Sequence, residues 1–409
     1  MDPRERTGIG STDDSIGLMI DDKKVEIYSS YEVKIAMMQQ PGAFSLRCGW
    51  ERTAHELWDL FRPGKKFELL LAGSKMMTGA IDAREIPQAK VTQIDVRGRD
   101  ALAPLFDNCF EEDCAFNTDT YFKLTRAVMD KAGMKDVQLV ADNNANRKIV
   151  GHIKYEAIGD RELVEQEKID MCRAAPASTG SQRMVFESVK AKMGKTYYAF
   201  LQEHYKLVGL MLWAFGDGSL CLARPNLNQP SAFVVSRMIG STRGTREEHS
   251  DITVHCWKDD RTHRHSHVRI KNHFTDACKG PKKIYGEAID EEMVADGIYK
   301  VAVYKEQNCK SLKDAKYLAH RRLAEERRMG WQLSYSFPGH RQPSQFGTDG
   351  WTTYLPDTCC RVDDDELRIH DDFFVEAVTY RCGPEKTTTI DLVRKDDMRY
   401  IAEKLIGEA

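Results

Sequence analysis

The 409-residue sequence has no Cys-x-x-Cys pair, no long apolar run and no large excess of charge. Its longest nearly apolar stretch, Val208 to Phe215, is far shorter than the roughly 20 residues that span a bilayer. The opening residues 1–22 are polar and lack the basic start and apolar core of a signal peptide. We therefore expect a protein that is made and folded in a cytoplasm, with its eleven cysteines free and no membrane-spanning segment.

The net charge of −3 comes without a long run of either sign. Proteins that bind nucleic acid by neutralising phosphates usually carry a basic excess or stripe, so this class is not indicated.

Catalytic signatures are also missing. There is no G-x-S-x-G elbow and no H-E-x-x-H pair. Gly216-Asp217-Gly218 lacks the following lysine of a phosphate loop. The acidic run Asp363 to Glu366 lacks the glycine and distal glutamate of a calcium loop, and a polar turn between strands is predicted there. We predict no enzyme, no catalytic residues and no cofactor.

One stretch is rich in histidine, from Thr262 to His267. In a strand, His263, His265 and His267 would project from one face, and neutral imidazoles bind zinc or iron. The neighbouring charged residues from Lys258 to Arg261 favour a solvated loop, and no cysteine or carboxylate stands at a usual zinc-ligand spacing. A loop without metal is predicted, with a metal site at the three histidines as the open alternative.

The length and the 41% apolar fraction allow two to four domains. After the polar leader 1–22, residues 23–106 alternate between apolar and polar positions, as in Val33, Ile35 and Met37, which is typical of strands with one buried face. Short strands with turn signals such as Gln40-Pro41-Gly42 predict a first β-barrel domain over 23–106.

Residues 107–228 show a different pattern. Helices are predicted near Tyr121 to Ala132 and Tyr197 to Leu207, each followed by a glycine that suits a helix end. The 76-residue spacing between these segments suggests an internal repeat. Asp217-Gly218 between two apolar runs predicts a hairpin. The region is interpreted as a small α/β module.

Residues 229–409 return to strand patterns, with one helix inserted at 311–329. Ser311 and Asp314 resemble a capping box, Leu312, Ala315, Leu318, Ala319 and Leu323 form one apolar face, and Gly330 is expected to end the helix. The sequence thus predicts a β-rich α+β fold: two β-barrel tube-type domains, an intervening α/β module and an inserted helix.

The order of these elements resembles that of baseplate hub proteins of contractile-tailed phages, the group with the Mu-type tail protein and the late-control protein D family. Relatives form the first part of the valine-glycine-repeat spike in type VI secretion. The residues that carry the resemblance are distributed from about 22 to 400: Thr92 to Asp100 with Leu105, Gly194 to Leu201, Asp217 to Pro225, the helix from Ala315 to Arg328 with Tyr335 to His340, Gly350-Trp351, Leu355-Pro356, Phe374 to Tyr380, and Thr387 to Leu392. The polar leader and the stretch 255–280 depart from the family pattern.

The resemblance implies a structural subunit in the tail baseplate of a virion, assembled in the bacterial cytoplasm. It implies a homotrimer whose paired barrels give a pseudo-sixfold ring between the tail tube protein and the central spike protein. Other baseplate proteins and the tape measure protein are further expected partners, and DNA is expected only as transient channel cargo. Two alternatives remain: a metal-dependent cell-wall hydrolase centred on the three histidines, and a type VI spike component.

Overall fold

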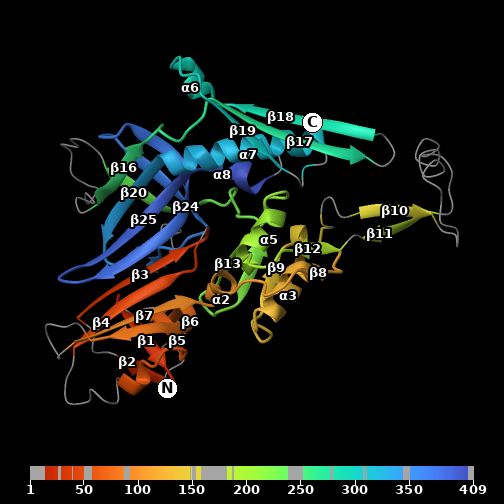
Figure 1. Cartoon of the computed structure of the whole chain (residues 1–409). Helices are drawn as coiled ribbons and strands as arrows, with labels where there is room; N and C mark the ends of the chain where they lie inside the picture. Colours follow the sequence, from red (N-terminus) through yellow and green to blue (C-terminus); the bar gives the residue numbers. More distant parts are fainter. Residues whose placement is uncertain are drawn as a thin grey trace.

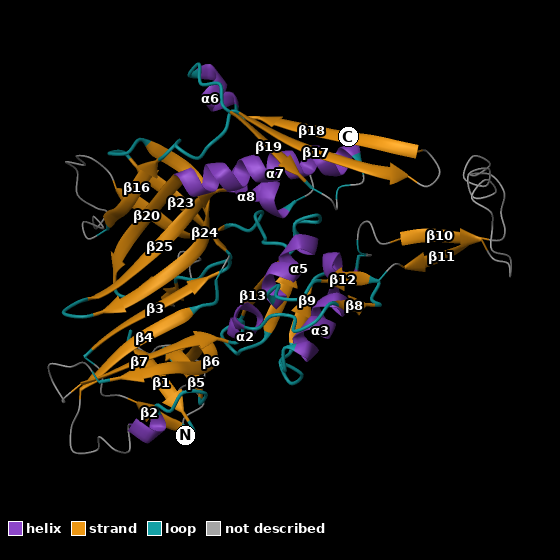
Figure 2. Ribbon diagram, viewed as in Figure 1, coloured by secondary structure: helices purple, strands orange, loops and turns teal. Residues whose placement is uncertain are grey.

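The computed structural model describes residues 14–25, 29–38, 40–49, 58–86, 93–147, 149, 153–157, 182–186, 188–237, 252–276, 280–306, 309, 311–343 and 351–403. Most of the polar leader predicted over 1–22 lies outside these residues. The fold is β-rich with a smaller helical part, as predicted, and Figures 1 and 2 show its sheets and helices. No described helix is long and apolar enough to cross a membrane.

The first β-rich region contributes seven strands. They are β1 (Ile16–Ile20), β2 (Lys23–Val25), β3 (Ser30–Ala36), β4 (Ala43–Gly49), β5 (Lys66–Leu71), β6 (Ser74–Glu85) and β7 (Gln93–Asp100). Alternate side chains of β4 are buried, as the sequence alternation predicts. Gly98 in β7 is required by close packing, because a Cβ there would lie 2.6 Å from the ring of Phe44.

The last region contributes the remaining β-rich part and the longest helix. Its elements are β15 (Ser231–Arg237), β16 (Thr253–Asp259), β17 (His267–Asp276), β18 (Gly280–Ile289), α6 (Glu291–Ala295), β19 (Val301–Lys305), α7 (Leu312–Gly330), β20 (Trp331–Pro338), β21 (Arg341–Pro343), β22 (Trp351–Thr353), β23 (Thr358–Asp364), β24 (Ile369–Cys382), β25 (Lys386–Arg394) and α8 (Lys395–Ala402).

One hydrogen-bonded sheet of 13 strands runs through both regions, in the order β16-β20-β25-β24-β3-β4-β7-β6-β5-β1-β2. In addition, β23 pairs with β24, and β15 pairs with β23. The regions meet where β24 pairs with β3, from Ala377 opposite Ala36 to Cys382 opposite Tyr31. One apolar cluster continues through both, from Leu18 and Phe67 to Phe233 and Ile390. Alternation predicts each set of strands, but the pairing of β3 with a strand about 340 residues later depends on tertiary structure.

The helix α7 has the predicted cap, since the Ser311 hydroxyl accepts from the Asp314 amide at 3.0 Å. The predicted apolar face is buried except for Leu312, which is 56% exposed. The helix ends at Gly330, as predicted, although Gly330 is not in the left-handed conformation that is common at helix ends. The chain passes directly into β20, and a Cβ at Gly330 would lie 2.3 Å from the Asp260 carbonyl, so close packing requires the glycine.

Between the β-rich regions lies the α/β module. Its elements are α2 (Ala103–Asp107), β8 (Cys114–Phe116), α3 (Tyr121–Lys131), β9 (Leu139–Ala141), the 3₁₀ turn η2 (Asn143–Asn146), β10 (Ile153–Ala157), β11 (Gln182–Phe186), β12 (Val189–Ala191), α5 (Tyr197–Tyr205), β13 (Met211–Ala214) and β14 (Leu220–Ala223).

The structure confirms the internal repeat in this module. Thr120 and Thr196 cap α3 and α5 with the same contact, each hydroxyl accepting from an amide three residues later at 3.3 Å. Gly133 and Gly209 follow the helices with φ of 78° and 76°. The preceding strands β8 and β12 pair with each other, and the helices share one core in which the Thr125 and Tyr205 hydroxyls are bonded. The predicted hairpin is β13–β14.

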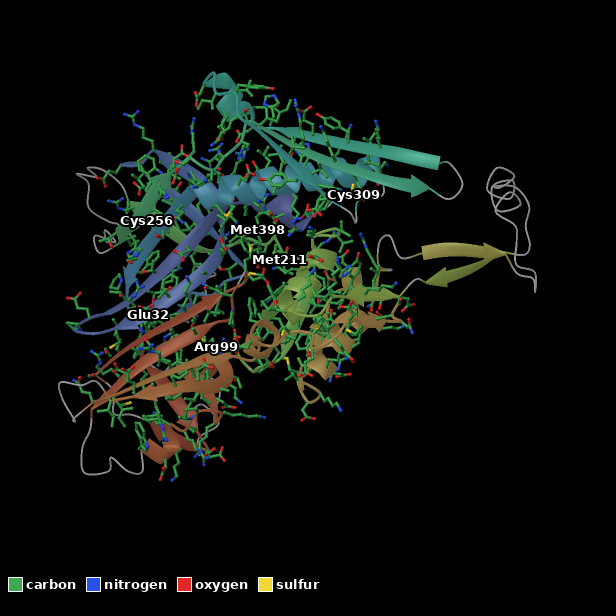
Figure 3. All side chains as sticks on the ribbon, in the orientation of Figure 1. Glu32, Arg99, Met211, Cys256, Cys309 and Met398 are labelled. Carbon is green, nitrogen blue, oxygen red and sulfur yellow. The ribbon has the colours of Figure 1, made fainter. Side chains whose placement is uncertain are left out.

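The module packs closely against the end of the chain. A Cβ on Gly209 would lie 2.0 Å from the Ala402 carbonyl oxygen of α8. Met211 of β13 and Met398 of α8 belong to one apolar cluster, and Figure 3 labels both at this contact. The module is therefore joined to the second β-rich region through a shared core.

The described cysteines are free thiols, as predicted. The adjacent Cys359 and Cys360 point to opposite faces of β23, since Cys360 packs in the large core and Cys359 in the cluster with Met398. Burial raises the pKa of the Cys48 and Cys221 thiols to about 12, so both remain protonated at neutral pH.

A polar sheet face as the candidate functional site

The histidine-rich stretch is a structural turn in which the three histidines have different environments. The His265 ring contacts the Glu326 carboxylate at 2.9 Å. The His267 ring lies 5.0 Å from the ring of Tyr299 and contacts the Ser266 hydroxyl, and His263 is exposed. Within the described residues, no group of three or more histidines, cysteines or carboxylates could hold a metal ion. His273 lies on β17, but its side chain is outside the described residues.

Arg264 anchors the same stretch through buried ion pairs. Its guanidinium is buried and forms ion pairs with Asp290 at 2.7 Å and Glu292 at 2.8 Å. Asp290 is itself buried and caps α6 through the Met293 amide. Sequence reasoning assigned Arg264 to a solvated loop and missed this ion pair, because the partners lie about 26 residues further along the chain.

The acidic run Asp363 to Glu366 covers the end of β23 and the first two residues of the β23–β24 turn. Asp364 accepts hydrogen bonds from the Glu366 and Leu367 amides at 3.0 Å, which is the turn predicted. Burial tends to raise the pKa of Asp364, but the hydrogen bonds from Leu367, Tyr335 and Arg237 hold it below its usual value.

A polar surface of the sheet lies opposite its apolar core. Residues paired across strands point to the same side of a sheet, so the register defines this surface. We call it the polar face; it comprises Ser336, Thr387, Asp391, Arg381, Glu32, Lys34, Ser45, Arg47, Asp95, Arg97 and Arg99. Their neighbours along each strand, such as Val33, Leu46 and Val96, are buried in the core.

The polar face crosses the junction between the two β-rich regions where Thr387 of β25, Arg381 of β24 and Glu32 of β3 lie opposite one another. In the neighbouring row the register passes from Ser336 through the buried Thr389 and Thr379 to Lys34. The side chains of Arg381 and Glu32 are in contact at 2.8 Å. The polar surface therefore continues from one region to the other.

The arginines of this face are paired with acids on neighbouring strands. Arg47 of β4 binds Asp95 of β7 through two contacts, at 2.8 and 3.0 Å. The hydrogen bond from Arg47 lowers the pKa of Asp95 and raises that of the guanidinium. Arg99 binds both Asp82 and Asp107, each at 2.7 Å, and Figure 3 labels Arg99 and Glu32 on their strands. Most of the positive charge on the polar face is therefore balanced by neighbouring carboxylates.

A hollow of about 430 Å³ opens at the junction of the two regions. Its charged lining consists of Glu32, Arg47, Asp95, Arg97 and Arg381. Because four of these five groups belong to the ion pairs just described, the hollow offers a hydrated, charge-compensated surface.

A buried polar contact fastens the junction from the opposite side. His340, fully buried after β20, contacts the Tyr31 hydroxyl of β3 at 2.7 Å and the Thr388 hydroxyl of β25 at 2.9 Å. Thr388 donates to the Gly339 carbonyl, so it accepts from Nδ1 of His340, and Nε2 accepts from Tyr31. Asp14 accepts from the His340 amide at 2.7 Å.

Burial is the main cause that lowers the pKa of His340 to about 4, with Lys386 acting in the same direction and Asp14 against it. The imidazole is therefore neutral at physiological pH, as the two hydrogen bonds require. The sequence contained no signal for this contact, since its groups come from positions 14, 31, 340 and 388.

Comparison with known proteins supports the fold. No protein-family model and no curated protein matches the sequence. The tail protein of Neisseria meningitidis is similar in structure, with a TM-score of 0.69, 16% identity, and coverage of 95% of this chain and 99% of that one. The 43 kDa tail protein of prophage MuSo2 from Shewanella oneidensis has a TM-score of 0.65 and 17% identity, and the match covers 94% of this chain and 99% of that one. Prophage tail protein gp18 of Listeria monocytogenes has a TM-score of 0.50 and 8% identity, and the match covers 96% of this chain and 99% of that one. This chain has the fold of those tail proteins over almost its whole length.

Proposed function

We propose that this chain is a hub subunit of a phage-type contractile tail. Three copies form a ring that joins the sixfold tail tube to the threefold central spike, in the baseplate of a virion or a related particle. The tube protein and the spike protein are the direct partners, and other baseplate proteins and the tape measure protein are further ones. The shared tail-protein fold supports this assignment.

The observation that carries the proposal is the construction of the continuous sheet. Its strands β16, β20, β25 and β24 form one antiparallel unit, and β3, β4, β7 and β6 form a second, joined edge to edge. A chain with two such units presents six of them when three copies assemble. A trimer can therefore face a sixfold tube on one side and a threefold spike on the other, which is the geometric problem that a hub solves.

The polar face supports a role as part of the channel lining. A lumen must stay wet and must not retain its cargo, and this face combines hydroxyl groups with arginines whose charge is compensated by Glu32, Asp95, Asp82 and Asp107. DNA would pass it as transient cargo without finding a row of unpaired cations.

Native mass measurement by light scattering tests the proposal. The purified chain, alone or mixed with its tube and spike proteins, should give a trimer or a complex that contains three copies. A chain that remains monomeric with both partners present would contradict the proposal. Cryo-electron microscopy of assembled tail tips should then place the polar face toward the axis.

The hydrolase alternative would require His263, His265 and His267 to converge on one ion. His265 is instead held by Glu326, and His267 lies against Tyr299. No observation on the described residues favours this alternative over the hub.

A further inference from the structure

A second exposed sheet face lies at one margin of the molecule, formed by β18, β17 and β19 (Figure 1). Its inner side packs on α7 through Val268, Ile270 and Ile284. The packing is close, because a Cβ on Gly286 would lie 2.2 Å from the backbone of Ala315. The sheet is therefore a fixed platform with one side left open.

The open side carries large apolar side chains. Tyr285, Ile289, Tyr299 and Val303 are between 42% and 72% exposed. With Val294 and Ile298 nearby, six of the fourteen large apolar side chains that are exposed in the described chain lie between residues 285 and 303. Such clustering on a soluble protein marks an interaction surface rather than random exposure.

The same side carries two lysines without a described acidic partner. Lys271 of β17 and Lys305 of β19 stand directly opposite each other, and Tyr285 lies on the other side of Lys271. Arg269, two residues before Lys271, is paired with Glu287 at 2.7 Å. Like charges placed opposite each other destabilise a sheet, so the lysine pair favours an acidic group from outside.

The edge of this sheet is open along β19, which pairs only with β17 among the described residues. The His267 amide donates to the Lys300 carbonyl, and the Glu306 amide donates to that of Lys271. In this parallel register the even-numbered residues of β19 direct their backbone groups to β17. Val301, Val303 and Lys305 therefore direct theirs to the open edge.

We propose that β19 receives an extended segment of a partner protein as a fourth strand. Every second side chain of the partner strand would face the open side. Of these, apolar groups would lie beside Val301 and Val303, and a carboxylate would lie beside Lys305, whose other neighbour is Lys271. Backbone hydrogen bonds provide affinity in this mode, and the alternate side chains provide specificity. The site does not depend on the hub function, since none of its residues belongs to the polar face.

A labelled synthetic peptide tests the site. The probe alternates threonine with valine and glutamate, and a matched control peptide has lysine in place of each glutamate. Fluorescence anisotropy with the full 409-residue chain should show saturable binding of the acidic peptide, and binding of the lysine peptide about tenfold weaker. Equal binding of both peptides, or no saturable binding, would overturn the proposal.

Two variants locate the binding to β19. Val303→Pro removes an amide that faces the open edge, so the existing pairing with β17 is retained while an added strand is blocked. We expect its circular dichroism to be unchanged and its peptide binding to be lost. The double variant Lys271→Glu, Lys305→Glu should prefer the lysine peptide.

Lys190→Glu with Lys192→Glu is the matched control, because these exposed lysines lie in the module, far from β19 in the sequence. This control should bind the acidic peptide like the unchanged chain.

If Val303→Pro binds the peptide as well as the unchanged chain does, the edge of β19 is not the binding site. If the unchanged chain self-associates and Val303→Pro abolishes this association, the occupant of the edge is a second copy of this chain, and the proposal of a partner protein is overturned.

Discussion

The polar face and the open side of the β17–β19 sheet are both exposed sheet surfaces, but they differ in how their charges and apolar groups are arranged. On the polar face, Arg47, Arg99 and Arg381 each contact an acid on a neighbouring element. On the open side, Lys271 and Lys305 oppose each other beside exposed Tyr285 and Val303. A surface with internally satisfied charges has little to gain from a partner, whereas the second surface can gain both pairing and apolar burial.

Next to the β17–β19 sheet, Arg264 before β17 pairs with the buried Asp290 that follows β18. Arg264→Ala would leave the buried Asp290 carboxylate without its partner, so we expect unfolding to become easier by about 3–5 kcal/mol. Urea denaturation followed by tryptophan fluorescence measures this change. Arg321→Ala on α7 provides a control at a partly buried arginine that belongs to a different contact, the pair with Glu325. An Arg264 variant with unchanged stability would contradict the assigned role.

A second expected effect concerns the junction that makes the polar face continuous. The unfolded chain binds a proton at His340 below about pH 6.5, and the folded chain binds one only below about pH 4. Acidification between these values therefore favours the unfolded chain, and His340 should contribute a loss of up to about 3 kcal/mol by pH 4. The loss is absent above about pH 6.5.

The variant His340→Gln isolates this contribution, because glutamine has no proton to gain in this range. The difference in unfolding free energy between the unchanged chain and the variant, measured from pH 7 to pH 4, should shrink as the pH falls. Other buried acids, including Asp100 and Asp397 with pKa values raised to about 6 by burial, act equally in both proteins. A difference that is independent of pH would contradict the neutral, buried imidazole.

The sequence predicted what is local and missed what is distant. Alternation in β4, the Ser311 cap and the repeat around Thr120 and Thr196 were all readable, because each depends on residues within a few positions or on a visible spacing. The β3–β24 pairing and the His340 contact were not, since they join residues more than 300 positions apart.

The candidate sites show the same difference between local features, which the sequence predicts, and distant contacts, which it does not. Polar positions opposite apolar ones could be listed from the sequence, but which arginine meets which acid depends on register, and register depends on the assembled sheet. In the histidine-rich stretch a loop without metal was predicted, with convergence of the three histidines as the alternative. The structure gives His265 and His267 separate partners, which spacing along the chain could not reveal.

The charge compensation of the polar face can be removed without touching its arginines. In the double variant Glu32→Gln, Asp95→Asn, Arg47 and Arg381 lose their acidic partners. Short double-stranded DNA should then bind with an affinity that falls steeply as salt rises, whereas the unchanged chain should bind weakly. Electrophoretic mobility at several salt concentrations measures this effect. Tight binding by the unchanged chain would contradict a compensated face.

The smallest expected effect compares the two faces directly through one charge reversal on each. Lys305→Glu replaces the lysine pair with an opposite-charge pair across β17 and β19, and we expect a gain of about 0.5 kcal/mol in stability. Asp95→Lys replaces the pair with Arg47 by a like-charge pair and should lose stability of the same order. Urea midpoints at low and high salt measure both, and salt should reduce both differences. If both reversals changed stability in the same direction, the lysine pair would not be the unsatisfied contact from which the partner site on β19 is inferred.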